Sequence, residues 1–338
     1  MSRALMVKSA GPGLTVQDTG RPGYLTFGLS RSGAADMQAV AEGAALLGQE
    51  TACAVLEMAS MGGTFEAVVD MRIALTGAPM RATLAGAPLA WNASHLLPAG
   101  SELSIGPALE GVYGYLSVGG GFATASMLGS RSAHLAGGLH GAVAAGTELP
   151  VGPDPRTEVN QTLPVEPRFN GGTIRIVASA QTDLFSPAER TRFTETSFKR
   201  DTRANRMGAR LLTDGAGFAA AEGLTILSEA IVPGDIQITG DGTPFVLLSE
   251  SQTTGGYPRI GSVLPSDLGR VAQAPAGATL RFSFVDLEDA VAIERAARAV
   301  RDTLSQRVVP LVRDPRKMRD LLSHQMISGV TDGSVGAG

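Results

Sequence analysis

Short apolar runs alternate with glycine-rich turns along most of the chain. This pattern is typical of β-rich folds and unlike the regular alternation of strands and helices in α/β proteins. In the first half, the strands predicted from it are Met71–Thr76, Met80–Leu84, Pro88–Trp91, Glu102–Ile105 and Val112–Val118. Ala85-Gly86-Ala87 predicts a hairpin between the second and third of these strands, because glycine there can adopt positive φ.

One helix is predicted in the first half, from about Asp36 to Leu47. Asp36 can cap its N-terminus, Val40, Ala44 and Leu47 share one face, and Gly48 can end it.

The second half repeats the β-rich pattern and ends in a helix. Its predicted strands are Thr173–Ser179, Asp235–Ile238, Pro244–Leu248 and Ala278–Val285. Ser186-Pro187-Ala188-Glu189 has the form of a capping box and predicts the start of a short helix. From about Leu287 to Leu304, apolar residues recur at spacings of three and four, which indicates an amphipathic helix.

The polar, proline-rich stretch from Pro150 to Pro167 is the predicted linker. We therefore expect a mainly β protein of two β-barrel-like or sandwich-like domains, with a few short helices and a C-terminal helix. The predicted limits are 1–155 for the N-terminal domain, 165–308 for the C-terminal domain with its helix, and 309–338 for a tail that ends in the glycine-rich segment Gly329–Gly338.

Composition narrows the function classes. A net charge of −4 and 5% aromatic residues argue against a nucleic-acid-binding protein. Cys53 is the single cysteine, which excludes an internal disulfide and fits a cytoplasmic location. The sequence contains neither a signal-peptide h-region nor an apolar run of about 20 residues, so we expect no membrane span. The four histidines, His95, His134, His140 and His324, show no metal-ligand spacing, and we expect no metal site.

The segment Gln252–Pro258 (QTTGGYP) is the most unusual local string. Its two threonines and two glycines suit a turn that presents hydroxyl and N–H groups to an oxygen-rich ligand. The alternative is a tight turn whose hydroxyls bond the backbone. Near the N-terminus, Asp18 and Arg21 suit either anion binding or an internal ion pair that holds a loop. Arg131, in the segment Leu128–Ser132, suits either an oxyanion site or a solvated loop. Neither a dinucleotide fingerprint nor a Walker loop is present.

Taken together, these strings resemble the carboxyltransferase family that includes KipA, the C subunit of 5-oxoprolinase (PxpC) and the allophanate-hydrolase-subunit-2-like proteins. The first domain carries TVQDTGRPGY (15–24), SGAAD (32–36), VLE (55–57), LTGA (75–78), YLSVGGG (115–121) and LGSRS (128–132). The second carries NRMGARL (205–211), LSEAIVPGDIQIT (227–239) and SQTTGGYPRI (251–260). The resemblance covers roughly residues 5–285.

The resemblance implies cyclophilin-like β-barrels and a multi-subunit enzyme. Family members pair with a KipI-type subunit, which is the B subunit of 5-oxoprolinase (PxpB). Together with a LamB/YcsF-type subunit (PxpA), they use ATP to open 5-oxoproline to glutamate. Fused relatives form the carboxyltransferase part of urea carboxylase, which takes the carboxyl group from carboxybiotin. Both chemistries act on an N–C=O group.

The resemblance also supplies the candidate residues. The expected catalytic residues are Gln237, Gln252, Arg206 and Glu229. The expected substrate-binding residues are Arg21, Asp36, Arg131, Thr253, Thr254, Gly255, Gly256 and Tyr257. The chain departs from the usual family pattern at Met37, Ala44, Asn205 and Glu250.

Three functions remain open on the sequence alone. The first is a subunit of an ATP-dependent 5-oxoprolinase-type complex, inactive by itself. The second is the carboxyltransferase half of a biotin-dependent urea or amide carboxylase. The third is a non-enzymatic antagonist of a KipI-type protein.

Overall fold

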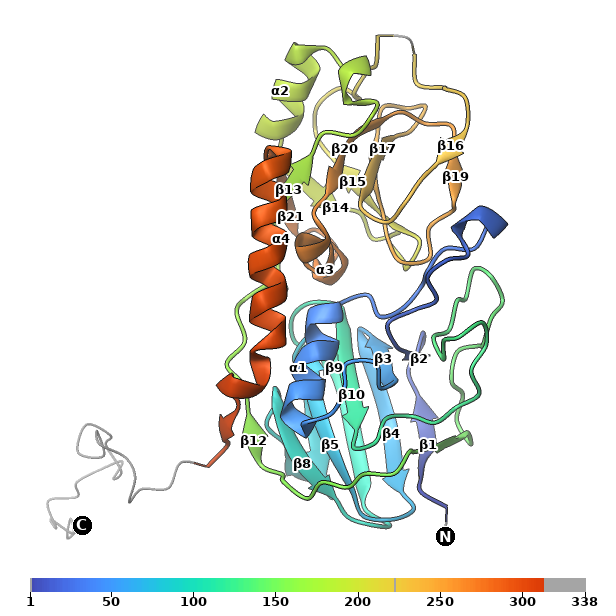
Figure 1. Cartoon of the computed structure of the whole chain (residues 1–338), viewed down its shortest axis with the longest axis vertical. Coiled ribbons are helices and arrows are strands. Elements are labelled where there is room, and N and C mark those ends of the chain that lie inside the picture. Colours follow the sequence, from blue (N-terminus) through green and yellow to red (C-terminus); the bar gives the residue numbers. More distant parts are fainter. Residues whose placement is uncertain (1, 222, 313–338) are drawn as a thin grey trace, which may run out of the picture.

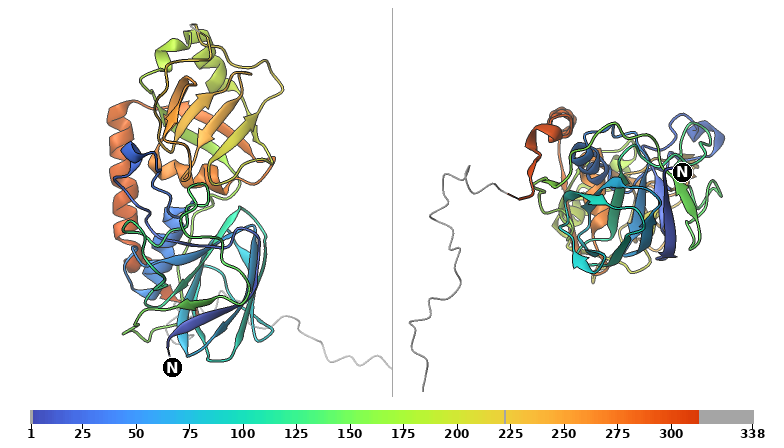
Figure 2. Two further views of the ribbon diagram at one scale, coloured as in Figure 1. Left: turned by 90° about the vertical axis from the view of Figure 1, so that its right-hand side faces the viewer. Right: turned by 90° about the horizontal axis from the view of Figure 1, so that it is seen from below.

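The computed structural model describes residues 2–221 and 223–312, which form two β-rich units, one above the other, with one long helix beside both (Figures 1 and 2). Residues 313–338, with His324 and the segment Gly329–Gly338, lie outside the described residues. Within the described part, every helix is too short or too polar to span a membrane.

The first unit is a sandwich of two sheets whose facing apolar side chains form one core. One sheet has the order β11-β1-β4-β9-β6-β7, and its strands are β1 (Ala4–Ala10), β4 (Met61–Ala67), β6 (Met80–Leu84), β7 (Ala87–Pro88), β9 (Glu102–Ala108) and β11 (Glu148–Pro150). The other has the order β2-β3-β10-β5-β8-β12-β22, and its strands are β2 (Thr15–Gln17), β3 (Val55–Ala59), β5 (Met71–Gly77), β8 (Ala93–Leu97), β10 (Tyr113–Val118), β12 (Gln161–Thr162) and β22 (Val309–Pro310).

Helix α1 (Met37–Leu47) covers the second sheet, against β5 and β10. Its predicted signals are confirmed. Asp36 caps the helix by accepting hydrogen bonds from the N–H groups of Gln38 and Ala39, both at 3.1 Å. Gly48 ends it in the left-handed region, which glycine adopts without steric cost.

The second unit is a closed seven-stranded barrel with the order β13-β20-β17-β18-β15-β14-β21. Its strands are β13 (Gly172–Val177), β14 (Phe198–Arg200), β15 (Gly208–Leu212), β17 (Asp235–Ile238), β18 (Pro244–Leu247), β20 (Arg259–Val263) and β21 (Thr279–Phe284). A small ribbon of β16 (Glu229–Ala230) and β19 (Thr254–Gly255) lies outside the barrel. Two helices accompany the barrel, α2 (Pro187–Glu195), capped by Ser186 as predicted, and α3 (Pro265–Gln273).

Helix α4 (Leu287–Asp302) leaves the barrel and runs back along the sandwich (Figure 1). It is followed by the 3-10 turn η3 (Leu304–Arg307), which packs on α1, and by β22, which pairs with β12. Two further 3-10 turns are η1 (Leu25–Phe27) and η2 (Thr182–Leu184).

The expected mainly β fold with short helices and a C-terminal helix is confirmed. Barrel closure holds for the second unit, whereas the first is a two-sheet sandwich. The domain limits at residues 155 and 165 stay a prediction. The predicted linker is not wholly free of structure, because β12 pairs with β8 of the sandwich.

Candidate functional site

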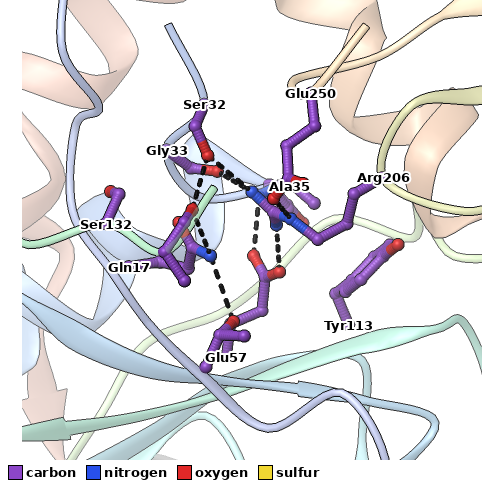
Figure 3. A network of polar contacts seen from close by, with 12 residues as sticks. Gln17, Ser32, Gly33, Ala35, Glu57, Tyr113, Ser132, Arg206 and Glu250 are labelled. Carbon is purple, nitrogen blue, oxygen red and sulfur yellow. Dashed lines mark hydrogen bonds and ion pairs between the residues drawn. The ribbon is translucent and has the colours of Figure 1, made fainter. Parts of the chain in front are cut away.

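Arg206 is a buried arginine that lies where the two units meet and bonds to residues of both (Figure 3). This residue precedes β15 of the barrel and is 8% exposed. Its Nε donates to Glu250 at 2.5 Å, its Nη1 donates to Glu57, and its Nη2 donates to the carbonyl oxygen of Gly33 at 2.6 Å. One barrel arginine therefore bridges a sandwich strand, a sandwich loop and a barrel turn.

Glu57, on β3, is 1% exposed, and its carboxylate accepts hydrogen bonds from both units. Besides the bond from Arg206, its carboxylate accepts hydrogen bonds from the Ala35 N–H at 2.7 Å and the Tyr115 hydroxyl at 2.8 Å. The same hydroxyl accepts a bond from the Asp36 N–H at 2.8 Å. The start of α1 is thereby tied to the Arg206 network.

Glu250 connects the network to a loop of the sandwich. Its Oε2 accepts a hydrogen bond from the Ala136 N–H at 3.1 Å and lies 3.8 Å from Nδ1 of His134. That Nδ1 accepts from the Gly137 N–H, which assigns the proton to Nε2, 2.9 Å from Ser30 Oγ. Burial lowers the pKa of His134, so the ring is neutral at pH 7.

A cavity of about 550 Å³ opens beside this network, between the units, and we call it the interunit cavity. Its volume lies in the range of small-molecule sites. Its lining is Gly13, Ala59, Ser60, Gly111, Val112, Tyr113, Leu135, Ala136, Arg200, Thr202, Ala204, Asn205, Arg206, Met207, Glu250, Pro275 and Ala276. A second cavity of about 530 Å³ shares Tyr113 and Arg206 with it, so these two side chains line both spaces.

Tyr113 is a hydrogen-bond donor in this setting. Burial, with the nearby charge of Glu57, raises the pKa of Tyr113 to about 12, so its hydroxyl keeps its proton at neutral pH. Within residues 2–221 and 223–312, Gln273 bonds the backbone N–H and carbonyl of Tyr113, and no hydrogen bond is formed at the hydroxyl. It is therefore available to a ligand in the cavity.

Arg21 and Arg131 form no hydrogen bond to Arg206, Glu57 or Glu250 among the described residues, although Arg21 lies within electrostatic reach of Glu250 and His134. Arg21 donates through Nη2 to the Ser132 carbonyl, and Arg131 donates through Nε to the Thr124 carbonyl at 2.8 Å. Both guanidinium groups thus order the loop that runs from residue 124 to residue 132. A role in substrate binding stays a prediction for each.

Asp18 holds the same loop without an ion pair to Arg21. Its carboxylate accepts hydrogen bonds from the hydroxyls of Ser132 at 2.5 Å and Ser130 at 2.6 Å, and from the N–H groups of Arg131 at 2.7 Å and Gly20 at 2.8 Å. Burial raises the pKa of Asp18, but these hydrogen bonds outweigh it and leave the pKa below its usual value. The expected ion pair between Asp18 and Arg21 is replaced by this loop clamp.

The acidic side chain of Asp36 takes part in a second ion-pair group. It accepts from Arg168 at 3.1 Å and from Gln273 Nε2 at 3.0 Å, and Arg168 also pairs with Glu42 at 2.8 Å. This group lines a separate cavity of about 280 Å³ beside α1, α3 and α4. Asp36 therefore joins the two units and caps α1, outside the lining of the interunit cavity.

The segment Gln252–Pro258 forms a third group, at the β16–β19 ribbon. Its Gly255 packs closely against Gln237 of β17, since a Cβ on that glycine would collide with Gln237 Nε2. That Nε2 is buried and has no hydrogen-bond partner among the described residues. Thr253 is buried, and its carbonyl accepts from the Ile231 N–H at 3.0 Å.

The remaining residues of this group face outward. Gln252 and Thr254 are exposed, and Tyr257 is 40% exposed, while the Gly256 carbonyl accepts from the Ile226 N–H at 2.9 Å. Glu229 is on the surface, paired with Arg259 at 2.7 Å. Within the described residues, no hydrogen bond joins the segment Gln252–Pro258 to Arg206. The candidate residues thus fall into separate groups, and their catalytic and binding roles stay predictions.

Sequence reasoning overlooked Glu57, which binds Arg206, and also Tyr113 and Arg200, which line the interunit cavity. A carboxylate inside the apolar strand Val55–Ala59 is a recognisable signal, since buried acids require partners. Glu250 stands out in the sequence only as a departure from the family pattern. No cluster of three or more potential metal ligands occurs within the described residues.

Similarities to known families and proteins cover most of the chain. The family "Carboxyltransferase domain, subdomain A and B" matches residues 27–284. The 5-oxoprolinase C subunit of Haemophilus influenzae is 33% identical over 287 residues, covering 83% of this chain and 91% of that protein. The Escherichia coli protein of the same name is 33% identical over 292 residues, covering 85% and 93%.

Among solved structures, the Kluyveromyces lactis urea carboxylase matches 93% of this chain with a TM-score of 0.83 at 24% identity, which shows a shared fold. The chain spans 31% of the length of that carboxylase. Another solved structure matches with a TM-score of 0.77 at 30% identity, and the chain spans 56% of its length.

Proposed function

Because the chain belongs to the carboxyltransferase domain family, subdomains A and B, we propose that it is an enzyme subunit acting on an amide-like N–C=O group. More specifically, we propose a subunit of an ATP-dependent 5-oxoprolinase-type complex that opens 5-oxoproline, or a related lactam, to glutamate. The similarity to two 5-oxoprolinase C subunits over more than 80% of this chain supports this choice.

The observation that carries the proposal is the interunit cavity with its polar wall. A lactam offers a carbonyl oxygen that accepts and an N–H that donates. The protonated Tyr113 hydroxyl can donate to such an oxygen, and the Glu250 carboxylate can accept from such an N–H. Arg206 would hold Glu250 in place rather than contact the substrate, because its donors are engaged with Glu250, Glu57, Ser32 and Gly33.

The expected partners are a KipI-type (PxpB) subunit and a LamB/YcsF-type (PxpA) subunit. ATP is expected to act in the assembled complex. The Arg206 side chain does not suit a phosphate, because carboxylates and carbonyls already take its donors. We also propose a cytoplasmic location, consistent with the single free cysteine, Cys53.

A second candidate is the carboxyltransferase half of a biotin-dependent urea or amide carboxylase, favoured by the fold shared with urea carboxylase over 93% of this chain. The interunit cavity combines arginines with apolar residues such as Val112 and Pro275, which suits a ureido ring with a carboxylate. Carboxybiotin, when bound, would supply the carboxyl group. This chain's residues would orient the acceptor amide.

The deciding experiment is purification of the chain alone and with its two partners, followed by an ATP-dependent assay on 5-oxoproline and on urea. We expect turnover of 5-oxoproline only by the assembled complex, and a loss of at least about tenfold in Glu250→Gln, since one charge-assisted hydrogen bond is worth that much. Turnover by the single chain would contradict the proposal. Carboxylation of urea with a biotin carboxylase, without 5-oxoproline cleavage, would establish the second candidate.

A further inference from the structure

Arg200, the last residue of β14, is a buried arginine without an ionic partner among the described residues. It is 7% exposed, and its Nε has no hydrogen-bond partner within the same part of the chain. It lies on the same face of the strand as Phe198, whose ring is in the barrel core. The strand therefore carries the guanidinium inward at the end of the barrel, where it lines the interunit cavity.

The carboxylate next to Arg200 in the chain and the carboxylate in the lining of the interunit cavity are bonded to other groups. The carboxylate of Asp201, its chain neighbour, pairs with Arg203 at 2.7 Å and Arg210 at 3.2 Å. Glu250, the carboxylate in the cavity lining, binds Arg206 and the Ala136 N–H. Across residues 2–221 and 223–312, Arg200 forms no ion pair, in contrast to Arg206, which has two.

An unpaired buried cation is unfavourable for folding. Burial lowers the pKa of Arg200, yet an arginine stays protonated at neutral pH. The site therefore holds a positive charge and a planar set of N–H donors, of which Nε is left without a partner by the described residues. A planar carboxylate is the matching acceptor, because two of its oxygens can take parallel hydrogen bonds from one guanidinium.

We propose that Arg200 binds the carboxylate of the substrate in the interunit cavity and selects carboxylate-bearing lactams over neutral amides. Tyr113 lines the same cavity within the electrostatic reach of Arg200 and can donate to the other end of the ligand. This assignment rests on the proposed function, and it adds the residue that distinguishes 5-oxoproline from urea, which has no carboxylate.

Three small probes separate carboxylate binding by Arg200 from recognition of the lactam. 5-Oxoproline has a lactam and a carboxylate, 2-pyrrolidinone has the lactam only, and cyclopentanecarboxylate has the carboxylate only. Dissociation constants are measured by NMR titration or calorimetry on the full chain and on the assembled complex. We expect the wild type to bind 5-oxoproline about ten- to a hundredfold more tightly than 2-pyrrolidinone, the usual range for a charge-assisted hydrogen bond.

The variant Arg200→Met should reduce that ratio to about one and leave the affinity for 2-pyrrolidinone unchanged. The matched control is Arg203→Met, whose side chain is 68% exposed and whose loss should change neither affinity. Arg200→Lys keeps the charge without the planar fork and should retain part of the preference. The melting temperature of Arg200→Met should stay equal or rise, because an unpaired buried charge is removed.

The inference is overturned if Arg200→Met leaves both carboxylate probes unaffected, if no carboxylate probe binds the wild type, or if the melting temperature falls along with the preference. One further outcome would contradict the proposed function while leaving the Arg200 site intact. If cyclopentanecarboxylate binds the wild type as tightly as 5-oxoproline and loses affinity in Arg200→Met, the carboxylate site stands while lactam recognition fails.

Discussion

Replacing Glu57 by glutamine tests how much the Arg206 network contributes to joining the two units. The carboxylate accepts from Arg206 on Oε1 and from the Ala35 N–H and the Tyr115 hydroxyl on Oε2. A glutamine has one oxygen and one NH₂ group. If its oxygen keeps the bonds from Ala35 and Tyr115, its NH₂ group faces the donors of Arg206.

The expected cost follows from that loss. A hydrogen bond to a charged group contributes about 1.5–3 kcal/mol, and removing one partner of a buried ion pair costs about 3–5 kcal/mol. Arg206 keeps Glu250, Ser32 and Gly33 as acceptors, so the lower part of this range applies. We expect Glu57→Gln to lower the free energy of unfolding by about 3 kcal/mol. Glu57→Ala orphans all three donors and should cost about 5 kcal/mol.

The assay is equilibrium unfolding in guanidinium chloride, with Glu66→Gln as the matched control. Glu66 also lies on a sandwich strand and pairs with Lys8 at 2.9 Å, but both side chains are exposed, so its loss should cost less than about 1 kcal/mol. If Glu57→Gln and Glu66→Gln unfold at the same guanidinium chloride midpoint, the contacts of Arg206 with Glu57 do not stabilise the fold by the expected amount.

Three further outcomes are expected. Gln252→Ala should leave the activity of the assembled complex nearly unchanged and change the free energy of unfolding by less than about 0.5 kcal/mol, because the side chain is exposed and lies outside the lining of the interunit cavity. A ten- to hundredfold loss of activity at unchanged stability would instead support the catalytic role expected for Gln252 and contradict the placement of the substrate in the interunit cavity. Limited trypsin treatment should cut first after Arg156, which lies in an exposed stretch, and mass spectrometry of the earliest fragments checks this. Because the folded-state pKa of Asp18 is lowered, this carboxylate stabilises the fold above its unfolded-state pKa of about 3.9, and the contribution is lost as the pH falls through the folded pKa. Asn cannot titrate, so a plot of the free energy of unfolding against pH should be flatter below about pH 4 for Asp18→Asn than for the wild type.

Local signals predicted the elements that depend on neighbouring residues. The cap of α1 by Asp36, the cap of α2 by Ser186 and the strand Asp235–Ile238 are found where the sequence indicated them. Gly86 indeed has positive φ at the hairpin after β6. Each of these features is set by contacts a few residues apart, which is why the sequence alone sufficed.

The grouping of the candidate residues depends on contacts between distant segments. Arg206 meets Glu57 across 149 positions, and Asp36 meets Gln273 across 237. Nothing in the local spacing of these residues indicates such pairs. Arg200 was overlooked for a related reason. The segment FKR (198–200) lies next to several other charged residues, a pattern typical of a polar surface segment, and only the closed barrel brings the end of β14 to the interunit cavity.

The two units are joined by two separate chain crossings, one before β13 and one along α4, and the pairing of β22 with β12 closes the second crossing onto the first. Each crossing keeps the partner surface at a high effective concentration, so the interface can stay closed without the large apolar area that two free proteins require. Two tethers also remove most rotational freedom and leave a hinge about the line that joins them. A tilt of the barrel about that line would widen the interunit cavity, but it would have to break the contacts of Arg206 with Glu57 and Gly33 and of Gln273 with Asp36.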